Sequence, residues 1–353
     1  MKRLFKNVLL SLFVLSLVSC VEDTHDLSKD FDSTVAVGNG ISFPLGDTEK
    51  ILMTEMLKGN KLLKTDEKGN FYIEQNGDIA AYNTEVDVDL GNDMDFFYDA
   101  DTKFLFNNPQ LFVTLDNNEN KEVLLKVSLS SYDRDGNVIA KDVQFDLTIP
   151  AKTKGKYYVT KNAAPLNGYT AVKGALPELF SGVPSRISIL LEPYGTSTGY
   201  NAVGDYNLVA PLDFGYIEYE YVDRSEDVLG SDPEDAVKHI SSFNLVTVSF
   251  DAYNTCPTEF TPSLVVYDVA GNRMESITAV TTSVIESGNG HLAAPVLSKV
   301  EFKLSSVNNE LKYMNDIEFF FKGVGEGVYN KNDYLQLKNV VVRIDSPIIL
   351  DFN

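Results

Sequence analysis

The residues that first suggest chemistry are aspartates spaced closely between positions 87 and 101. Carboxylate oxygens grouped in this way can bind calcium. However, Val86, Val88 and Leu90 alternate with the first of these aspartates, and such alternation is typical of a strand with one face in solvent. We therefore predict no metal site here and keep calcium binding as the alternative. The aspartates are Asp87, Asp89, Asp93, Asp95, Asp99 and Asp101.

A second group of oxygen ligands lies at Asp133, Asp135 and Asn137, which have the spacing of the first ligands of an EF-hand loop. That loop needs a bidentate glutamate at its twelfth position, where this sequence has Gln144. The other interpretation is a hairpin turn, in which an aspartate opens the turn and a glycine adopts the positive φ that closes it. We predict the turn.

Few residues could support catalysis. None of the histidines His25, His239 and His291 has a second histidine or a cysteine at metal-ligand spacing. A serine or cysteine triad needs a histidine held by a carboxylate, but His239 falls in a predicted linker and His291 in a glycine-rich turn. Paired carboxylates for glycoside hydrolysis stay open, although the sequence has no tryptophan for sugar stacking. We predict no enzyme activity, no catalytic residues and no metal.

The N-terminal segment, residues 1–19, is typical of a signal peptide. Lys2, Arg3 and Lys6 precede an apolar run at 8–17 that is too short to span a bilayer. The residues Leu17-Val18-Ser19-Cys20 resemble the bacterial lipobox, which implies cleavage before Cys20 and acylation of its thiol, for example with palmitate. Two or more acyl chains anchor a protein durably. An ordinary secretory signal is the alternative, and the lipid is the only cofactor that we expect.

The residues after Cys20 bear on localisation. Val21-Glu22-Asp23, followed by Asp26, is similar to the acidic export signal of Bacteroidetes lipoproteins. This resemblance implies an anchor in the outer membrane with exposure at the cell surface, the inner leaflet being the alternative. Residues 20–34 then form a flexible tether. Without residues 1–19 the chain carries 27 basic and 51 acidic residues, a net charge of −24, which disfavours nucleic-acid partners and leaves the lipid as the contact with the membrane.

An internal repeat is the clearest sign of architecture. A turn of the form D-x-x-G-N occurs at 66–70, 133–137 and 268–272. At an offset of 135, the alternating apolar positions of 111–115 fall on those of 246–250. Positions 187–191 match 317–321 at an offset of 130, and 205–206 match 333–334 at 128. Ordered matches with so little drift predict two copies of one module.

These patterns predict a mainly β protein with two tandem immunoglobulin-like antiparallel β-sandwiches, at 104–222 and 241–353. A jelly roll or an open barrel stays open. We expect an acidic linker at 223–240 and a small α+β unit at 35–103 that packs on the first sandwich. That unit would hold a helix from Asp47 or Thr48 to Lys58, ended by Gly59.

The sequence predicts a surface binding or accessory module whose ligand is unknown. The partner would be a protein or a glycan, held by sandwich-end loops or by exposed tyrosines such as Tyr194, Tyr200 and Tyr329. Ordinary packing in a sheet or loop is the alternative for these tyrosines. One alternative is a subunit of a Bacteroidetes-type fimbria, although that family matures by cleavage after an N-terminal arginine and the first arginine after the signal is Arg134. Another is a glycan-binding component of a polysaccharide-uptake complex. Cys256 would lack a disulfide partner, and we expect it to be buried.

Overall fold

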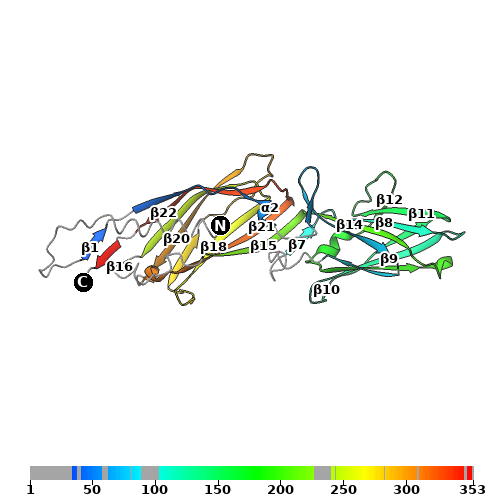
Figure 1. Ribbon diagram of the computed structural model, residues 1–353, viewed down its shortest axis with the longest axis horizontal. Helices are drawn as coiled ribbons and strands as arrows, with labels where there is room; N and C mark the ends of the chain where they lie inside the picture. The colour runs from blue at the N-terminus through cyan, green and yellow to red at the C-terminus, as the bar shows by residue number, and fades with distance from the viewer. Residues whose placement is uncertain are drawn as a thin grey trace.

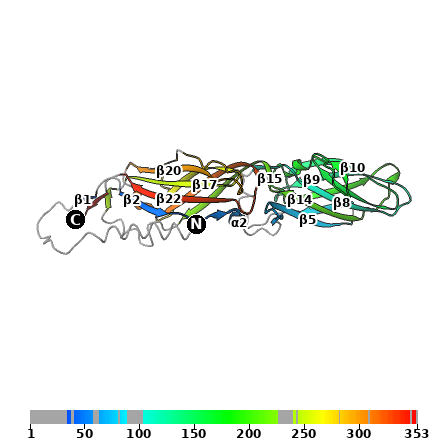
Figure 2. The same ribbon diagram turned by 90° about the horizontal axis from the view of Figure 1, so that it is seen from above.

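The protein is elongated, with two β-sandwiches arranged end to end along its long axis (Figures 1 and 2). The computed structural model describes residues 34–37, 41–57, 63–80, 82–88, 103–225, 240–242, 244–281, 283–307, 310–345 and 348–351. Strands dominate these residues, and the α-helix among them, α2 (Met53–Met56), is a single turn. The mainly β prediction is therefore confirmed.

Sandwich I has a wide sheet of six strands in the order β12-β11-β8-β14-β5-β4 and a narrow sheet in the order β10-β9-β13-β6. All neighbours are antiparallel except β11 and β12, which are parallel. The strands of the wide sheet are β4 (Leu63–Thr65), β5 (Phe71–Ile79), β8 (Gln110–Asn117), β11 (Thr153–Thr160), β12 (Thr170–Lys173) and β14 (Gly204–Pro211). Those of the narrow sheet are β6 (Asn83–Asp87), β9 (Val123–Tyr132), β10 (Val138–Ile149) and β13 (Arg186–Pro193).

Sandwich II has a wide sheet in the order β19-β20-β17-β22-β2, with β3 also on β22, and a narrow sheet in the order β18-β21-β15-β7. The wide sheet holds β2 (Ile41–Gly46), β3 (Ile51–Leu52), β17 (Leu245–Asn254), β19 (Ile277–Thr281), β20 (Val296–Ser306) and β22 (Tyr334–Ile344). The narrow sheet holds β7 (Lys103–Phe106), β15 (Asp213–Ser225), β18 (Thr258–Tyr267) and β21 (Asp316–Val328). A small third sheet joins β1 (Thr34–Val37), β23 (Ile348–Asp351) and β16 (Ile240–Ser242).

Strand pairing repeats between the two sandwiches. In sandwich I, β8 lies between β11 and β14, and in sandwich II, β17 lies between β20 and β22. Likewise β13 pairs with β9 as β21 pairs with β18. The copies differ after the D-x-x-G-N turns, because β10 extends a narrow sheet and β19 extends a wide one. The repeated pairing agrees with the matches that the sequence predicts.

The domain boundaries differ from those expected. Strands of the expected N-terminal unit, 35–103, are shared between the sandwiches, with β2 and β3 beside β22 and β4 to β6 in sandwich I. In addition, β15 crosses the expected boundary at residue 222 and pairs with β21 along its length. In sandwich II, β15 lies on the side of β21 away from β18, just as β6 in sandwich I lies on the side of β13 away from β9. Alternating residues predict which face of a strand is buried but not which strand is its partner. Residues 226–239, most of the expected linker, lie outside the described residues.

The expected helix at 47–58 is reduced to α2 because β22 binds the segment before it. The Thr48 N–H donates to the Leu337 carbonyl at 2.8 Å, and the Thr48 hydroxyl accepts the Leu337 N–H at 3.0 Å. Ile51 and Leu52 then pair with Leu335 and Tyr334 as strand β3. The groups that would cap a helix at Thr48 are thus used by a strand of sandwich II, and tertiary pairing overrides local helix propensity.

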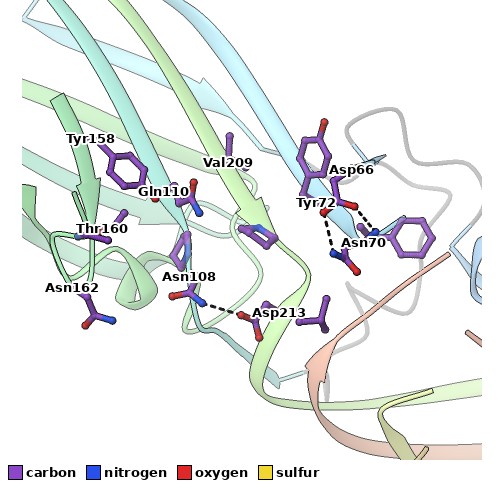
Figure 3. Close-up of a pocket in the computed structure, with 15 residues that line it drawn as sticks. Asp66, Asn70, Tyr72, Asn108, Gln110, Tyr158, Thr160, Asn162, Val209 and Asp213 are labelled. Carbon is purple, nitrogen blue, oxygen red and sulfur yellow. Dashed lines mark hydrogen bonds between the residues drawn. The ribbon is translucent and has the colours of Figure 1, made fainter. Parts of the chain in front are cut away.

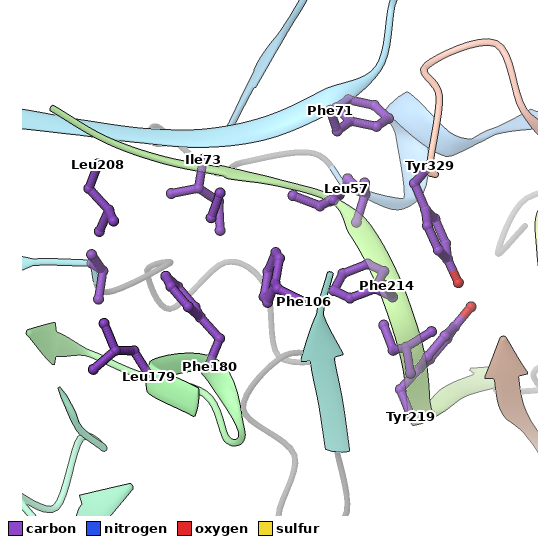
Figure 4. Packing of buried hydrophobic residues seen from close by; sticks show 14 of the residues in the cluster. Leu57, Phe71, Ile73, Phe106, Leu179, Phe180, Leu208, Phe214, Tyr219 and Tyr329 are labelled. Carbon is purple, nitrogen blue, oxygen red and sulfur yellow. The ribbon is translucent and has the colours of Figure 1, made fainter. Parts of the chain in front are cut away.

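The two hydrophobic cores meet at the junction of the sandwiches (Figure 4). The Phe106 ring lies 5.0 Å from that of Phe180 and 4.8 Å from that of Phe214, and the Phe214 ring lies 5.3 Å from that of Tyr329. All four side chains are buried. Tilted aromatic packing of this kind adds to the free energy of area burial. The sandwiches are therefore joined by packed side chains as well as by the chain.

Candidate functional site

A hollow of about 500 Å³ lies on the outer face of the wide sheet of sandwich I, where this sheet reaches the junction (Figure 3). Its volume is within the usual range of ligand pockets, about 300–1,000 Å³. Four adjacent strands supply its floor, with Tyr158 on β11, Gln110 on β8, Val209 on β14 and Tyr72 on β5. Their neighbours in the chain, such as Leu111 and Leu208, are buried in the core. Strand alternation thus directs these four side chains toward solvent.

Three aromatic side chains form a cluster beside and within this hollow, which we call the aromatic trio: Phe112, Tyr158 and Tyr169. Phe112 and Tyr158 are directly opposite each other on β8 and β11, with ring centroids 4.9 Å apart. Tyr169 meets Phe112 edge-on at 5.4 Å. All three are half-buried, and burial raises the pKa of the Tyr158 hydroxyl above its ordinary value of 10.0. The trio is therefore a neutral aromatic surface that remains in contact with solvent.

Among the described residues, the polar lining of the hollow includes amides, the Thr160 hydroxyl, and carboxylates that are already hydrogen-bonded. The Asp213 carboxylate accepts Nδ2–H bonds from Asn107 and Asn108, both at 2.9 Å. Asp66 accepts the N–H groups of Lys68 and Asn70, both at 2.8 Å, within its turn. Among the described lining residues there is no lysine or arginine. The hollow therefore offers amide groups to a ligand, together with two carboxylates that already accept hydrogen bonds from their own neighbours.

An ionic group borders the same face. The Glu74 carboxylate lies 2.6 Å from Lys64 Nζ and accepts an Nδ2–H bond from Asn207 at 2.9 Å. The hydrogen bonds from Lys64 and Asn207 hold the pKa of Glu74 below its usual value of 4.5. At neutral pH the Glu74 carboxylate is therefore ionised, and it is already bonded to Lys64 and Asn207.

Sandwich II has different chemistry at the equivalent positions. The offset of 135 takes Phe112 to Thr247, which is opposite Lys303 on β20 and Arg343 on β22. Arg343 pairs with Asp345, and Lys303 Nζ lies 3.0 Å from Glu301 Oε1. The corresponding strands of sandwich II thus have Thr247 and the ion-paired Lys303 and Arg343. Sandwich I has Phe112, Tyr158 and Asn207 at these positions. Exposed aromatic residues at these positions are therefore not a requirement of the fold.

Several predicted residues lie elsewhere. Cys20, His25, His239 and the aspartates at 89–101 are outside the described residues, and Asp87 is exposed on β6. Among the described residues, no three histidine, cysteine, aspartate or glutamate side chains are grouped so that they could hold a metal ion.

The turn at 133–137 is a hairpin turn, as predicted. Asp133 Oδ1 accepts the Asn137 N–H at 2.8 Å, its Oδ2 accepts an Nδ2–H bond from the same residue at 3.0 Å, and Gly136 has φ 82°. The Asp133 carboxylate is therefore satisfied within its turn.

His291 and Cys256 come near the same buried carboxylate but do not form a nucleophilic site. Asp333 accepts the N–H groups of His291 and Asn330 at 2.7 and 2.9 Å, and it lies 3.6 Å from His291 Nδ1. Cys256 is buried and free, as predicted. Burial, and then the charge of Asp333, raise the pKa of its thiol, whereas a reactive cysteine needs a lowered pKa.

The predicted tyrosines are mostly structural. Tyr194 is exposed, but Tyr200 and Tyr329 are buried. The Tyr200 hydroxyl donates to the Asp116 carbonyl at 2.6 Å, and the Tyr329 hydroxyl bonds that of Thr258. Tyr200 and Tyr329 thus follow the alternative of ordinary packing and are not exposed, because each hydroxyl has a partner inside the fold. Sequence reasoning missed the aromatic trio, whose signal was Phe112, an apolar residue at a solvent-facing position of an alternating strand.

Within the part of the chain that is described, no helix has the length and apolar character needed to cross a bilayer.

Comparison with known proteins shows the fold alone. No protein-family model matches the chain, and no curated protein matches it. A solved structure of a putative secreted protein from Parabacteroides distasonis ATCC 8503 matches with a TM-score of 0.62 at 16% identity, covering 89% of this chain and 99% of that chain. The N-terminal CBM22-1–CBM22-2 tandem domain of Paenibacillus barcinonensis Xyn10C matches with a TM-score of 0.20 at 11% identity, covering 88% and 93%. The second similarity is too weak to support an inference.

Proposed function

We propose that the protein is a lipid-anchored lipoprotein of the cell envelope, exposed at the surface of the outer membrane, that acts as a non-enzymatic binding module. The lipobox and the acidic residues after Cys20 support the anchor and the exposure. The fold shared with the putative secreted protein from Parabacteroides distasonis agrees with export.

The observation that carries the binding role is the aromatic trio beside the hollow. Apolar side chains grouped in contact with solvent are typical of interaction sites, and sandwich II has ion pairs at the same strand positions. The binding face is therefore the outer face of the wide sheet of sandwich I.

The long axis of the molecule fits this arrangement. Strand β1, where the described chain begins, lies at the end of sandwich II that is remote from sandwich I (Figure 1). An anchor at Cys20 precedes this strand by a short tether. Sandwich I, with its hollow, would then be the part of the molecule farthest from the membrane.

Metabolic labelling with a palmitate analogue tests the anchor, with a Cys20→Ala variant as the matched control. We expect the label on the wild-type chain, its recovery with membranes, and digestion by a protease added to intact cells. The Cys20→Ala chain should lack the label and leave the membrane fraction. An unlabelled wild type, or a Cys20→Ala chain that stays with the membranes, would contradict the proposal.

A further inference from the structure

We infer that the aromatic trio and the adjoining hollow bind an uncharged oligosaccharide. This inference rests on the proposed binding role and names its ligand class. Three features carry it: the shape and chemistry of the floor, the absence of a cation in the described lining, and the contrast with sandwich II.

The floor has the two kinds of group that a sugar needs. A pyranose ring has an apolar face of C–H groups that packs against aromatic rings, and the Phe112–Tyr158 pair offers such a surface. Sugar hydroxyls both donate and accept hydrogen bonds, and a side-chain amide can do both at once. Gln110 and Asn162 line the hollow (Figure 3), and neither amide makes a hydrogen bond within the described part of the chain.

The charges of the lining residues narrow the class of polar ligand that fits the hollow. An acidic sugar or a nucleic acid would need a cation, and the described lining has none. A basic peptide would have to pair with Asp66 or Asp213, and part of the acceptor capacity of each carboxylate is already used by hydrogen bonds from its own neighbours. A ligand rich in hydroxyl groups and without charge fits these groups best.

The extent of the floor favours a chain of sugars over one. From Tyr158 on β11 to Tyr72 on β5 the floor crosses four adjacent strands, or about 14 Å at the usual strand spacing. Its far wall is formed by the turn at 66–70, which Asn330 of sandwich II holds by an Nδ2–H bond to Asn70 Oδ1 at 2.9 Å. The end of the floor at this turn is thus held by sandwich II.

The test uses the full mature chain with Cys20→Ser, probed on an array of neutral and acidic oligosaccharides, followed by calorimetric titration of the best ligand. We expect neutral oligosaccharides to bind. Tyr158→Ala and Gln110→Ala should weaken binding by about tenfold or more, whereas Tyr158→Phe, which keeps the ring, should bind nearly as well as wild type. The matched control is Tyr253→Ala, because Tyr253 is an aromatic residue on the outer face of the wide sheet of sandwich II.

The inference would be overturned if no neutral sugar bound, if only acidic sugars bound, or if Tyr158→Ala and wild type bound equally well. Circular dichroism of each variant excludes misfolding as the cause of a loss. A peptide array probed in parallel separates this inference from the proposed function. Peptide binding that Tyr158→Ala abolishes would reject the glycan and keep the binding face, and the labelling of Cys20 tests the anchor independently.

Discussion

Two buried asparagines show how closely the two modules correspond at the scale of single residues. Asn117 ends β8, and its Nδ2 donates to the Lys121 carbonyl at 2.9 Å while its Oδ1 accepts the Glu119 N–H at 2.9 Å. Asn254 ends β17 and makes the same two bonds, four and two residues onward, at 2.8 and 2.9 Å. Each amide also binds a carbonyl from a distant segment. Each side chain therefore ties a strand end to a second part of its sandwich.

Replacing either amide should lower stability. Asn254→Ala leaves buried carbonyl and N–H groups without partners, at a cost of about 1–3 kcal/mol each. We expect the free energy of unfolding in urea to fall by at least about 1–3 kcal/mol, and by a similar amount for Asn117→Ala. The exposed neighbour Asn118 supplies the control variant Asn118→Ala, which should be near wild type. Stability unchanged in both buried variants would show that these amides are dispensable.

The Cys256 thiol should be inert in the folded chain. It is buried and its pKa is raised, so that little thiolate forms and a reagent cannot reach it. In the Cys20→Ser chain, we expect an aromatic disulfide reagent to release no colour under native conditions and one equivalent in guanidinium chloride. Rapid reaction of the native protein would mean that the loop after β17 opens.

At the scale of elements, the sequence predicted the turns and the buried faces of strands, but it did not predict which strands pair with each other. The three D-x-x-G-N turns were readable because an aspartate and a glycine specify the turn by themselves, and all three have the same aspartate–asparagine bonds. The alternation in 111–115 and 246–250 likewise predicted buried faces. By contrast, the place of β15 beside β21 depends on edges that only the folded sheets provide. The aromatic trio was missed for the same reason, since Phe112 and Tyr158 come together only when β8 and β11 pair.

The turn at 133–137 should make stability depend on pH. The hydrogen bonds from Asn137, the side chain first and then the N–H, lower the pKa of Asp133 below its usual value of 3.8. A lowered carboxyl pKa stabilises the fold above the unfolded pKa, and this contribution is lost as the pH falls through the folded value. Asp133→Asn should therefore be less stable than wild type near neutral pH, with a gap that narrows below pH 3.8.

Urea unfolding from pH 7 downward measures this gap. Asp135→Asn is the control within the same turn, because the Asp135 side chain is exposed and accepts no hydrogen bond within the described residues. A gap between Asp133→Asn and wild type that does not change with pH would contradict the role of the ionised carboxylate.

At the scale of the whole molecule, the junction makes the two sandwiches one unit. The chain passes from one sandwich to the other four times, between β3 and β4, β6 and β7, β7 and β8, and β14 and β15. The turn at 66–70 also contacts sandwich II through a Lys331 N–H bond to the Gly69 carbonyl at 2.8 Å. The hollow lies against this junction, and Val328 of sandwich II is one of its lining residues. Its shape therefore depends on how the sandwiches are held together.

Phe214→Ala tests the junction. Removing this buried ring between Phe106 and Tyr329 should cost about 3–5 kcal/mol. We expect calorimetry to show one cooperative transition for wild type and two for the variant, because the cores no longer support each other. Val138→Ala, an exposed change in a distant hairpin, should melt like wild type. A single unshifted transition for Phe214→Ala would show that this ring does not couple the sandwiches, and two transitions in the wild type would show that they are already independent.

The central claim is that a ligand is held on the outer face of sandwich I. Amide hydrogen exchange of the mature chain, with and without the tightest-binding neutral oligosaccharide, tests it most directly. We predict slower exchange in β8, β11 and the turn at 66–70, with sandwich II away from the junction unchanged. Protection confined to the wide sheet of sandwich II, or protection nowhere, would contradict the account.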